Sequence, residues 1–139
     1  MPLIKQNADA SAGIVGTDVT DGEFVFVSLP YSPTTPLAQS AAVFSRRMIV
    51  KAVYAVADVG ATNAVTVSVY KTASGVAPAS GALVHGGSIN AQGTANTNQV
   101  MALTAANVDV PLGSRICVVV SGAIGAAGSG VVTVALAPA

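Results

Sequence analysis

Few groups in this sequence could do acid–base, nucleophilic or metal chemistry. There is one histidine, His85, and one cysteine, Cys117, and their separation gives no metal-ligand spacing. A catalytic triad around His85 would need Asp58 or Asp109 and a serine, and no sequence context selects one. His85 ends an apolar run and precedes two glycines, so we interpret it as a structural histidine. Cys117 lies in the apolar run RICVVV, so we interpret it as a small core residue.

Three further patterns fall short of binding motifs. DVTDGE at 18–23 lacks the ligand spacing of a calcium loop. GAIGAAGSG at 122–130 has the glycines of a phosphate-binding loop, but no Lys-Ser/Thr follows them. Aromatic side chains that could stack on a sugar ring are few, and most fall in expected strands. The sequence therefore predicts no enzyme, no cofactor and no metal site.

The charge content is unusually low. Charged residues make up 9% of the chain and apolar residues 52%, whereas about 25% charged residues is typical. Solubility favours a well-charged surface, so we expect neighbours in an assembly to cover much of this one. The net charge is zero, which together with the scarcity of bases beside aromatics excludes a nucleic-acid partner.

The charges are unevenly distributed along the chain. The first 23 residues have a local charge of −3, because Lys5 is their only base and their acids are Asp9, Asp18, Asp21 and Glu23. The remainder carries +3, with adjacent bases at Arg46 and Arg47. An acidic arm and a basic body could pair within one chain or between chains. These acids and the two arginines are therefore candidate contact residues, with solvated surface charges as the alternative.

The last 24 residues, 116–139, contain no charge and are long enough to cross a bilayer. Glycines at 122, 125, 128 and 130 interrupt them, however, and valine-rich runs flank the glycines. This pattern favours a strand, a loop and a second strand. We therefore expect no membrane-spanning helix here.

Short apolar runs between turn signals predict an all-β chain. We expect strands over 24–30, 46–59, 64–72, 82–85, 98–104, 115–120 and 130–136, with 46–59 and 64–72 forming a hairpin around GATN. Residues 31–40 should be an extended loop, because prolines occur at 30, 33 and 36, and 38–47 could form one helical turn. In 46–59, the alternation places Met48, Val50, Ala52, Tyr54 and Val56 on one face. The predicted architecture is a single, jelly-roll-like β-sandwich over 24–139, with an extended N-terminal arm over 1–23.

Segments spread over 47–136 resemble a known family. They are AVTVSVYKT, GVAPASGALV, GSINAQGTANTNQVMALT, VPLGSRICVVVSG and GVVTVAL. This run is similar to the small β-sandwich decoration, or cement, proteins on the heads of tailed bacteriophages. It departs from that pattern at Ser114, where an acid would precede the arginine, and residues 1–46 have no counterpart.

The resemblance implies a jelly-roll-like fold, commonly trimeric, that binds local threefold positions on the outer surface of the virion's capsid. There it would clamp neighbouring copies of the major capsid protein. On this reading the loop GTANTNQ at 93–99, with Thr94 and Asn96, packs against a symmetry mate or the shell, and the arm orders on the shell or a neighbouring subunit. Two alternatives stay open: a receptor- or glycan-binding module of a phage fibre or spike, and a small hydrolase that would require His85.

Overall fold

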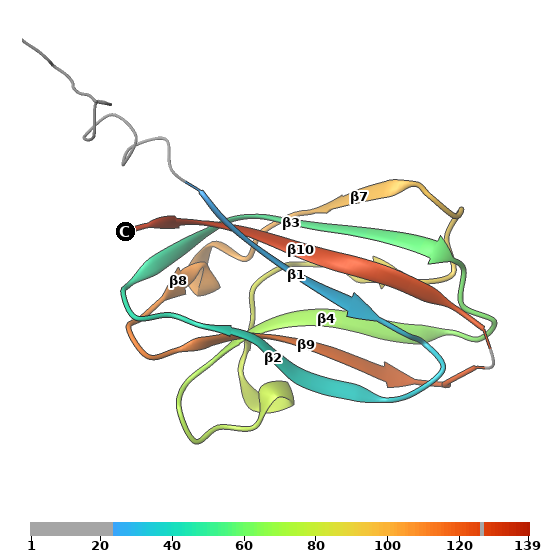
Figure 1. Ribbon diagram of the computed structural model, residues 1–139, viewed down its shortest axis with the longest axis horizontal. Helices are drawn as coiled ribbons and strands as arrows, with labels where there is room; N and C mark the ends of the chain where they lie inside the picture. The colour runs from blue at the N-terminus through green and yellow to red at the C-terminus, as the bar shows by residue number, and fades with distance from the viewer. Residues whose placement is uncertain (1–23, 126) are drawn as a thin grey trace, which may run out of the picture.

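The computed structural model describes residues 24–125 and 127–139, which form two packed antiparallel sheets (Figure 1). The proposed arm, with Asp9, Asp18, Asp21 and Glu23, lies outside the described residues. The strands are β1 (Val25–Tyr31), β2 (Leu37–Val43), β3 (Met48–Val59), β4 (Val65–Thr72), β5 (Ala82–Leu83), β6 (Ile89–Asn90), β7 (Asn98–Met101), β8 (Asp109–Val110), β9 (Arg115–Gly122) and β10 (Ser129–Pro138). Two short 3₁₀ turns, η1 (Pro78–Ser80) and η2 (Ala105–Asn107), lie in the connections.

Strands β1 to β4 alternate between the two sheets, β5 and β6 stay in the sheet of β4, β7 and β8 lie in the other sheet, and β9 and β10 again belong to different sheets. One sheet, the β10 sheet, has the order β1-β10-β3-β7, with β8 also pairing with β3. The other, the β9 sheet, has the order β2-β9-β4-β5, with β6 also pairing with β4. Figure 1 shows β3, β7 and β10 in one layer and β2, β4 and β9 in the other. This is the strand order of a jelly roll, so the predicted fold class is confirmed.

This topology makes two local predictions wrong. The expected hairpin does not form, because β3 pairs with β10 whereas β4 pairs with β9 in the opposite sheet. Residues 37–43 are neither loop nor helix but form β2, at the edge of the β9 sheet. The prolines at 33 and 36 both precede β2, so none of its backbone bonds to β9 is lost. The remaining predicted strands are present, several with shorter ends.

The predicted alternation of β3 holds only for its first residues. Ala135 pairs with Ala52 and Leu136 pairs with Val50, so Lys51 is an extra residue in β3. Such a bulge shifts the side-chain phase of the strand. Met48 and Val50 face the core as expected, but beyond the bulge the buried residues are Val53, Ala55 and Ala57. Tyr54 and Val56 consequently lie on the outer face of the sheet.

The core between the sheets consists mainly of valine, isoleucine and leucine. The β10 sheet contributes Val50, Val53, Val132, Val134 and Leu136, and the β9 sheet contributes Val67, Val69, Ile116, Val118 and Val120. Each of these side chains is at most 1% exposed. Burial of this apolar surface is the main force that holds the two sheets together.

Tyr31 is the largest aromatic residue in this core, and Gly130 makes space for it. A Cβ atom at residue 130 would lie 2.6 Å from the Tyr31 hydroxyl oxygen and 2.4 Å from the carbonyl oxygen of Val56. The Tyr31 hydroxyl is buried and has no hydrogen-bond partner among the described residues. Burial raises the pKa of Tyr31, and the charge of Asp58 adds to this effect. The residue therefore contributes packing rather than chemistry.

We predict that Gly130→Ala lowers the free energy of unfolding by about 2 kcal/mol, because overpacking forces backbone or ring to shift. Urea denaturation would measure the loss. Gly86→Ala is the matched control, since the nearest atom to its new Cβ would be the Ala102 carbonyl oxygen at 4.0 Å. Equal stability of Gly130→Ala and the wild type would contradict the packing described here.

Candidate interaction surfaces

His85 is fully buried, and both of its ring nitrogens have partners within the chain. Nε2 accepts a hydrogen bond from the Val69 amide at 3.1 Å. Nδ1 lies 3.2 Å from the Gly86 carbonyl oxygen, which assigns the proton to Nδ1 in a neutral ring. The predicted structural role of His85 is confirmed by these contacts.

Cys117 is also buried, on the side of the β9 sheet that faces away from the core. Its Sγ lies 3.7 Å from the Ser40 hydroxyl. Within residues 24–125 and 127–139, no three His, Cys, Asp or Glu side chains gather closely enough to hold a metal ion. The same residues include no helix long and apolar enough to span a bilayer. Residues 116–139 contribute β9, a connecting loop and β10, as predicted.

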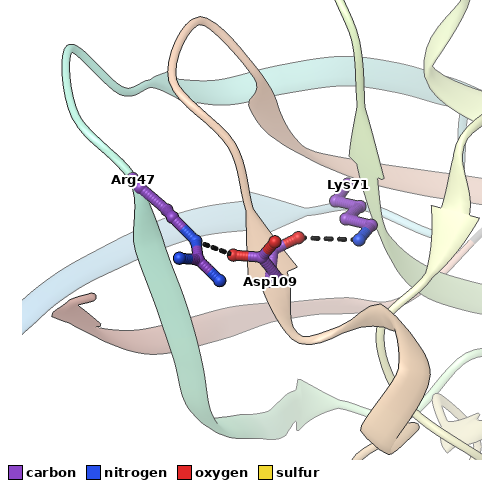
Figure 2. A network of polar contacts seen from close by, with 3 residues as sticks. All are labelled: Arg47, Lys71 and Asp109. Atoms are coloured by element: carbon purple, nitrogen blue, oxygen red, sulfur yellow. Dashed lines mark hydrogen bonds and ion pairs between the residues drawn. The ribbon is translucent and has the colours of Figure 1, made fainter.

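Arg47, a predicted contact residue, belongs to a polar network that joins the two sheets (Figure 2). Its Nε donates to Asp109 Oδ1 at 2.7 Å. From the β9 sheet, Lys71 Nζ donates to the Asp109 carbonyl oxygen at 2.6 Å. The pair is largely solvent-exposed, so its contribution to stability is small. Neighbouring Arg46 is exposed and has no ion-pair partner among the described residues.

Arg115 fixes a loop over the outer face of the β9 sheet. Its guanidinium donates to the Ser40 hydroxyl at 3.0 Å, and to the carbonyl oxygens of Ala73 and Val76. The loop carries η1, which contacts β2, β4 and β9. Ser68 and Val119 alternate with the core residues of their strands, yet they are 7% and 8% exposed. The loop from 73 to 81 therefore covers this face.

The outer face of the β10 sheet has no such cover among the described residues. The strand register places its outward side chains in three rows: Phe26, Ala135 and Ala52; Ser28, Thr133, Tyr54 and Val100; and Pro30, Val131, Val56 and Asn98. We call these eleven residues the open face. Phe26 is 64% exposed, Val100 69% and Tyr54 41%. None of the eleven carries a charge. At the border of the face, Lys51 lines a shallow hollow with Phe24, Phe26 and Tyr54, and exposed Asp58 follows Val56 two residues later in β3.

Hydrogen bonds between the Asn90 backbone and the Gln99 side chain close the loop that contains Thr94 and Asn96. The Gln99 side chain accepts a hydrogen bond from the Asn90 amide at 2.8 Å and donates to the Asn90 carbonyl at 3.0 Å. These two hydrogen bonds join β6 of one sheet to β7 of the other. Asn96 has a left-handed backbone, with φ at 61°, and its amide donates to the Ala57 carbonyl at 2.8 Å. Asn96 thus shapes the loop, whereas Thr94 is simply exposed.

Of the predicted contact residues, those that the structure describes do not lie together. Arg46 and Arg47 precede the first residue of β3, and the Asn96 amide binds Ala57 near the last. Twelve residues of strand separate these ends, a distance of about 40 Å at about 3.3 Å per residue. Figure 1 shows the two ends of β3 at opposite ends of the sandwich. The predicted residues therefore mark two separate surfaces.

Sequence reasoning missed the open face. The alternation in FVFV at 24–27 was the available signal, because it places both phenylalanines on one side of a strand. Both phases of this run are apolar, so the pattern does not say which side is outward. The structure places Val27 toward the core and leaves Phe24 and Phe26 exposed.

Comparisons with known proteins bear on the fold. No family model matches the chain, and no curated protein matches it. Among solved structures, it is similar to a chain of the cyanophage Pam1 capsid asymmetric unit, with a TM-score of 0.50 and 15% sequence identity. The match covers 82% of each chain. At this identity the similarity establishes a common fold.

The buried histidine predicts a pH dependence of stability. Burial lowers the pKa of His85 below its ordinary value of 6.5, and the hydrogen bond to Gly86 opposes this only in part. Below about pH 6.5 the unfolded chain therefore binds a proton that the folded chain does not, and the free energy of unfolding falls as the pH drops. The slope from this group is at most about 1.4 kcal/mol per pH unit.

Urea denaturation between pH 7 and pH 5 would measure this effect. His85→Gln, which keeps hydrogen-bonding capacity but does not titrate, should show a smaller change over the same range. A wild-type stability that does not fall between these pH values would contradict the burial of a neutral His85.

The Arg115 contacts predict that the covering loop depends on this side chain. In Arg115→Met, amide hydrogen exchange over residues 73–81 should accelerate by about tenfold, because the hydrogen bonds to Ala73 and Val76 are lost. Arg46→Met is the control, since Arg46 makes no such contact. Unchanged exchange in this loop would show that Arg115 does not hold it.

Proposed function

We propose that this chain is a structural virion protein that decorates and stabilises the capsid of a tailed bacteriophage. It binds the outside of the shell as a homo-oligomer, a trimer at local threefold positions, and its partners are the major capsid protein and its own copies. The observation that carries the proposal is the jelly-roll sandwich, whose likeness to a chain of a phage capsid asymmetric unit extends over 82% of both chains.

Two properties of the described residues support a structural role over a chemical one. A jelly roll by itself is compatible with many functions, so the support must come from its surfaces. His85 and Cys117, the residues most suited to chemistry, are both buried. The open face consists of eleven uncharged residues. Such a surface is better suited to a permanent protein–protein interface than to exposure on a monomer in solution.

The contact residues remain part of this proposal. At the end of the sandwich where the described chain begins, Arg46 lines a hollow with Val25 and Pro138, and the Arg47 carbonyl accepts a hydrogen bond from the Ala139 amide. The acidic residues Asp9, Asp18, Asp21 and Glu23 precede the sandwich in sequence and lie outside the described residues. Thr94 is exposed at the opposite end. We assign the first group to arm-mediated contacts and Thr94 to a separate contact with the shell or a neighbouring copy.

One observation favours the alternative, a glycan- or receptor-binding module. Phe24, Phe26 and Tyr54 are exposed around one hollow, with the two phenylalanine ring centroids 6.3 Å apart. Aromatic faces can stack on sugars, but sugar hydroxyls also need hydrogen-bonding groups. Among the side chains that line the hollow, only Lys51 and the hydroxyl of Tyr54 supply such groups. Decoration therefore remains the better-supported function.

Binding to phage heads tests the proposal. Heads of the phage that encodes this chain, prepared without it, should bind the purified protein saturably and co-sediment with it. We expect Thr94→Lys to weaken binding by about tenfold, equivalent to about 1.4 kcal/mol, because it places a bulky charge in the contact.

Ser74→Lys is the matched control, since Ser74, like Thr94, is exposed but lies in the loop over the β9 sheet. An absence of saturable binding, together with an absence of this chain from purified virions by mass spectrometry, would overturn the proposal. Glycan-array binding without head binding would favour the alternative.

A further inference from the structure

We propose that the open face of the β10 sheet is the surface that joins neighbouring copies of this chain. The inference deepens the proposed function, and rests on it for its setting, by naming the surface through which the homo-oligomer forms. It begins from an asymmetry between the two outer faces. On the β9 sheet, the chain covers its own outer face with the loop held by Arg115. On the β10 sheet, no described segment does so.

The open face combines large, exposed hydrophobic side chains with the smaller polar residues Ser28, Thr133 and Asn98. Phe26, Val100 and Tyr54 are 64%, 69% and 41% exposed, and adjacent Phe24 is 49% exposed. They extend across the sheet from β1 at one edge to β7 at the other. Exposed hydrophobic side chains gathered on one face of a sheet in this way mark an interaction site. Aromatic residues at its centre are also typical of interface cores.

The absence of charge on this face identifies the kind of partner. A partner with ordinary surface composition would bring charged groups for which the eleven residues of the face offer no partner, since Lys51 and Asp58 lie at its border, and burying unpaired charge is costly. The partner must therefore present a surface that is itself nearly uncharged. This chain is such a partner, because only 9% of its residues are charged against about 25% in a typical protein.

The size of the face fits a contact of modest strength. Four strands at about 4.8 Å spacing and about six residues at about 3.3 Å give a flat footprint on the order of 400 Å². A standard interface buries about 800 Å² on each partner. The projecting aromatic rings raise the accessible area above the flat value, but the contact stays small enough that one inserted charge should break it.

Light scattering after size exclusion, with the full chain over a range of concentrations, tests the inference. The wild type should be an oligomer, with a mass at least twice the 13.6 kDa of one chain. Val100→Asp should shift it to the monomer or raise the dissociation constant at least tenfold. Leu112→Asp is the matched control, because Leu112 is also 69% exposed but lies outside the open face.

A second pair guards against a local effect of Val100→Asp on the edge strand β7. Phe26→Asp should dissociate the oligomer, whereas Val43→Asp should not, although Val43 is 67% exposed. Circular dichroism would establish that each variant keeps its fold. A wild type that is monomeric at all concentrations, or an oligomer unaffected by both open-face variants, would overturn the inference.

The head-binding assay separates this inference from the proposed function. If the oligomer depends on the open face but no head binding occurs, the inference stands and the proposed function fails. If the wild type is monomeric and the open-face variants lose head binding, the shell protein occupies this face. That outcome overturns the inference and leaves the proposed function intact.

Discussion

The antiparallel pairing of β3 with β10 determines both the packing of the core and the composition of the open face. It runs from Met48 paired with Pro138 to Val59 paired with Ser129, through the centre of the β10 sheet. On its inner side it places Val53 and Val134 in the core. On its outer side it carries Tyr54, Val56, Val131 and Thr133, which form the middle of the open face. The close approach of Tyr31 to Gly130 also depends on this pairing, because Val56 limits the space at the same position.

The strands were predictable from sequence because period-two alternation and glycine- or proline-rich turns are local signals. AVTVSVYKT is the clearest case, and Val67 and Val69 are buried as its pattern requires. The pairing of the strands was not predictable in the same way. β3 and β4 are adjacent in sequence, but the jelly roll sends them to opposite sheets, and the favourable burial that decides this involves residues far apart in the chain. The bulge at Lys51 is similarly invisible, since it depends on the register with β10.

The site was predicted less completely than the fold. Sequence reasoning correctly treated Cys117 as buried, because it lies within an apolar run, and interpreted His85 as a structural histidine at the end of another; its burial was not predicted. It selected Arg46, Arg47, Thr94 and Asn96 as contacts from charge and polarity alone. The structure engages Arg47 with Asp109 and gives Asn96 a conformational role. The open face was not predicted, because its residues come from four strands and only the register of the sheet brings them together.

The structure shows where the uncharged surface residues of this chain are concentrated. Uncharged residues occupy the centre of the outer face of the β10 sheet, with Lys51 and Asp58 at its border, whereas the other sheet is shielded by a loop of the same chain. This division accounts for a chain that folds with its own core yet leaves an apolar surface to be covered by another molecule. A cryo-electron microscopy map of the virion would test this account most directly. We expect the sandwich on the outside of the shell, with its open face buried against a neighbouring copy. A map in which the chain is present but the open face contacts solvent alone would contradict the account.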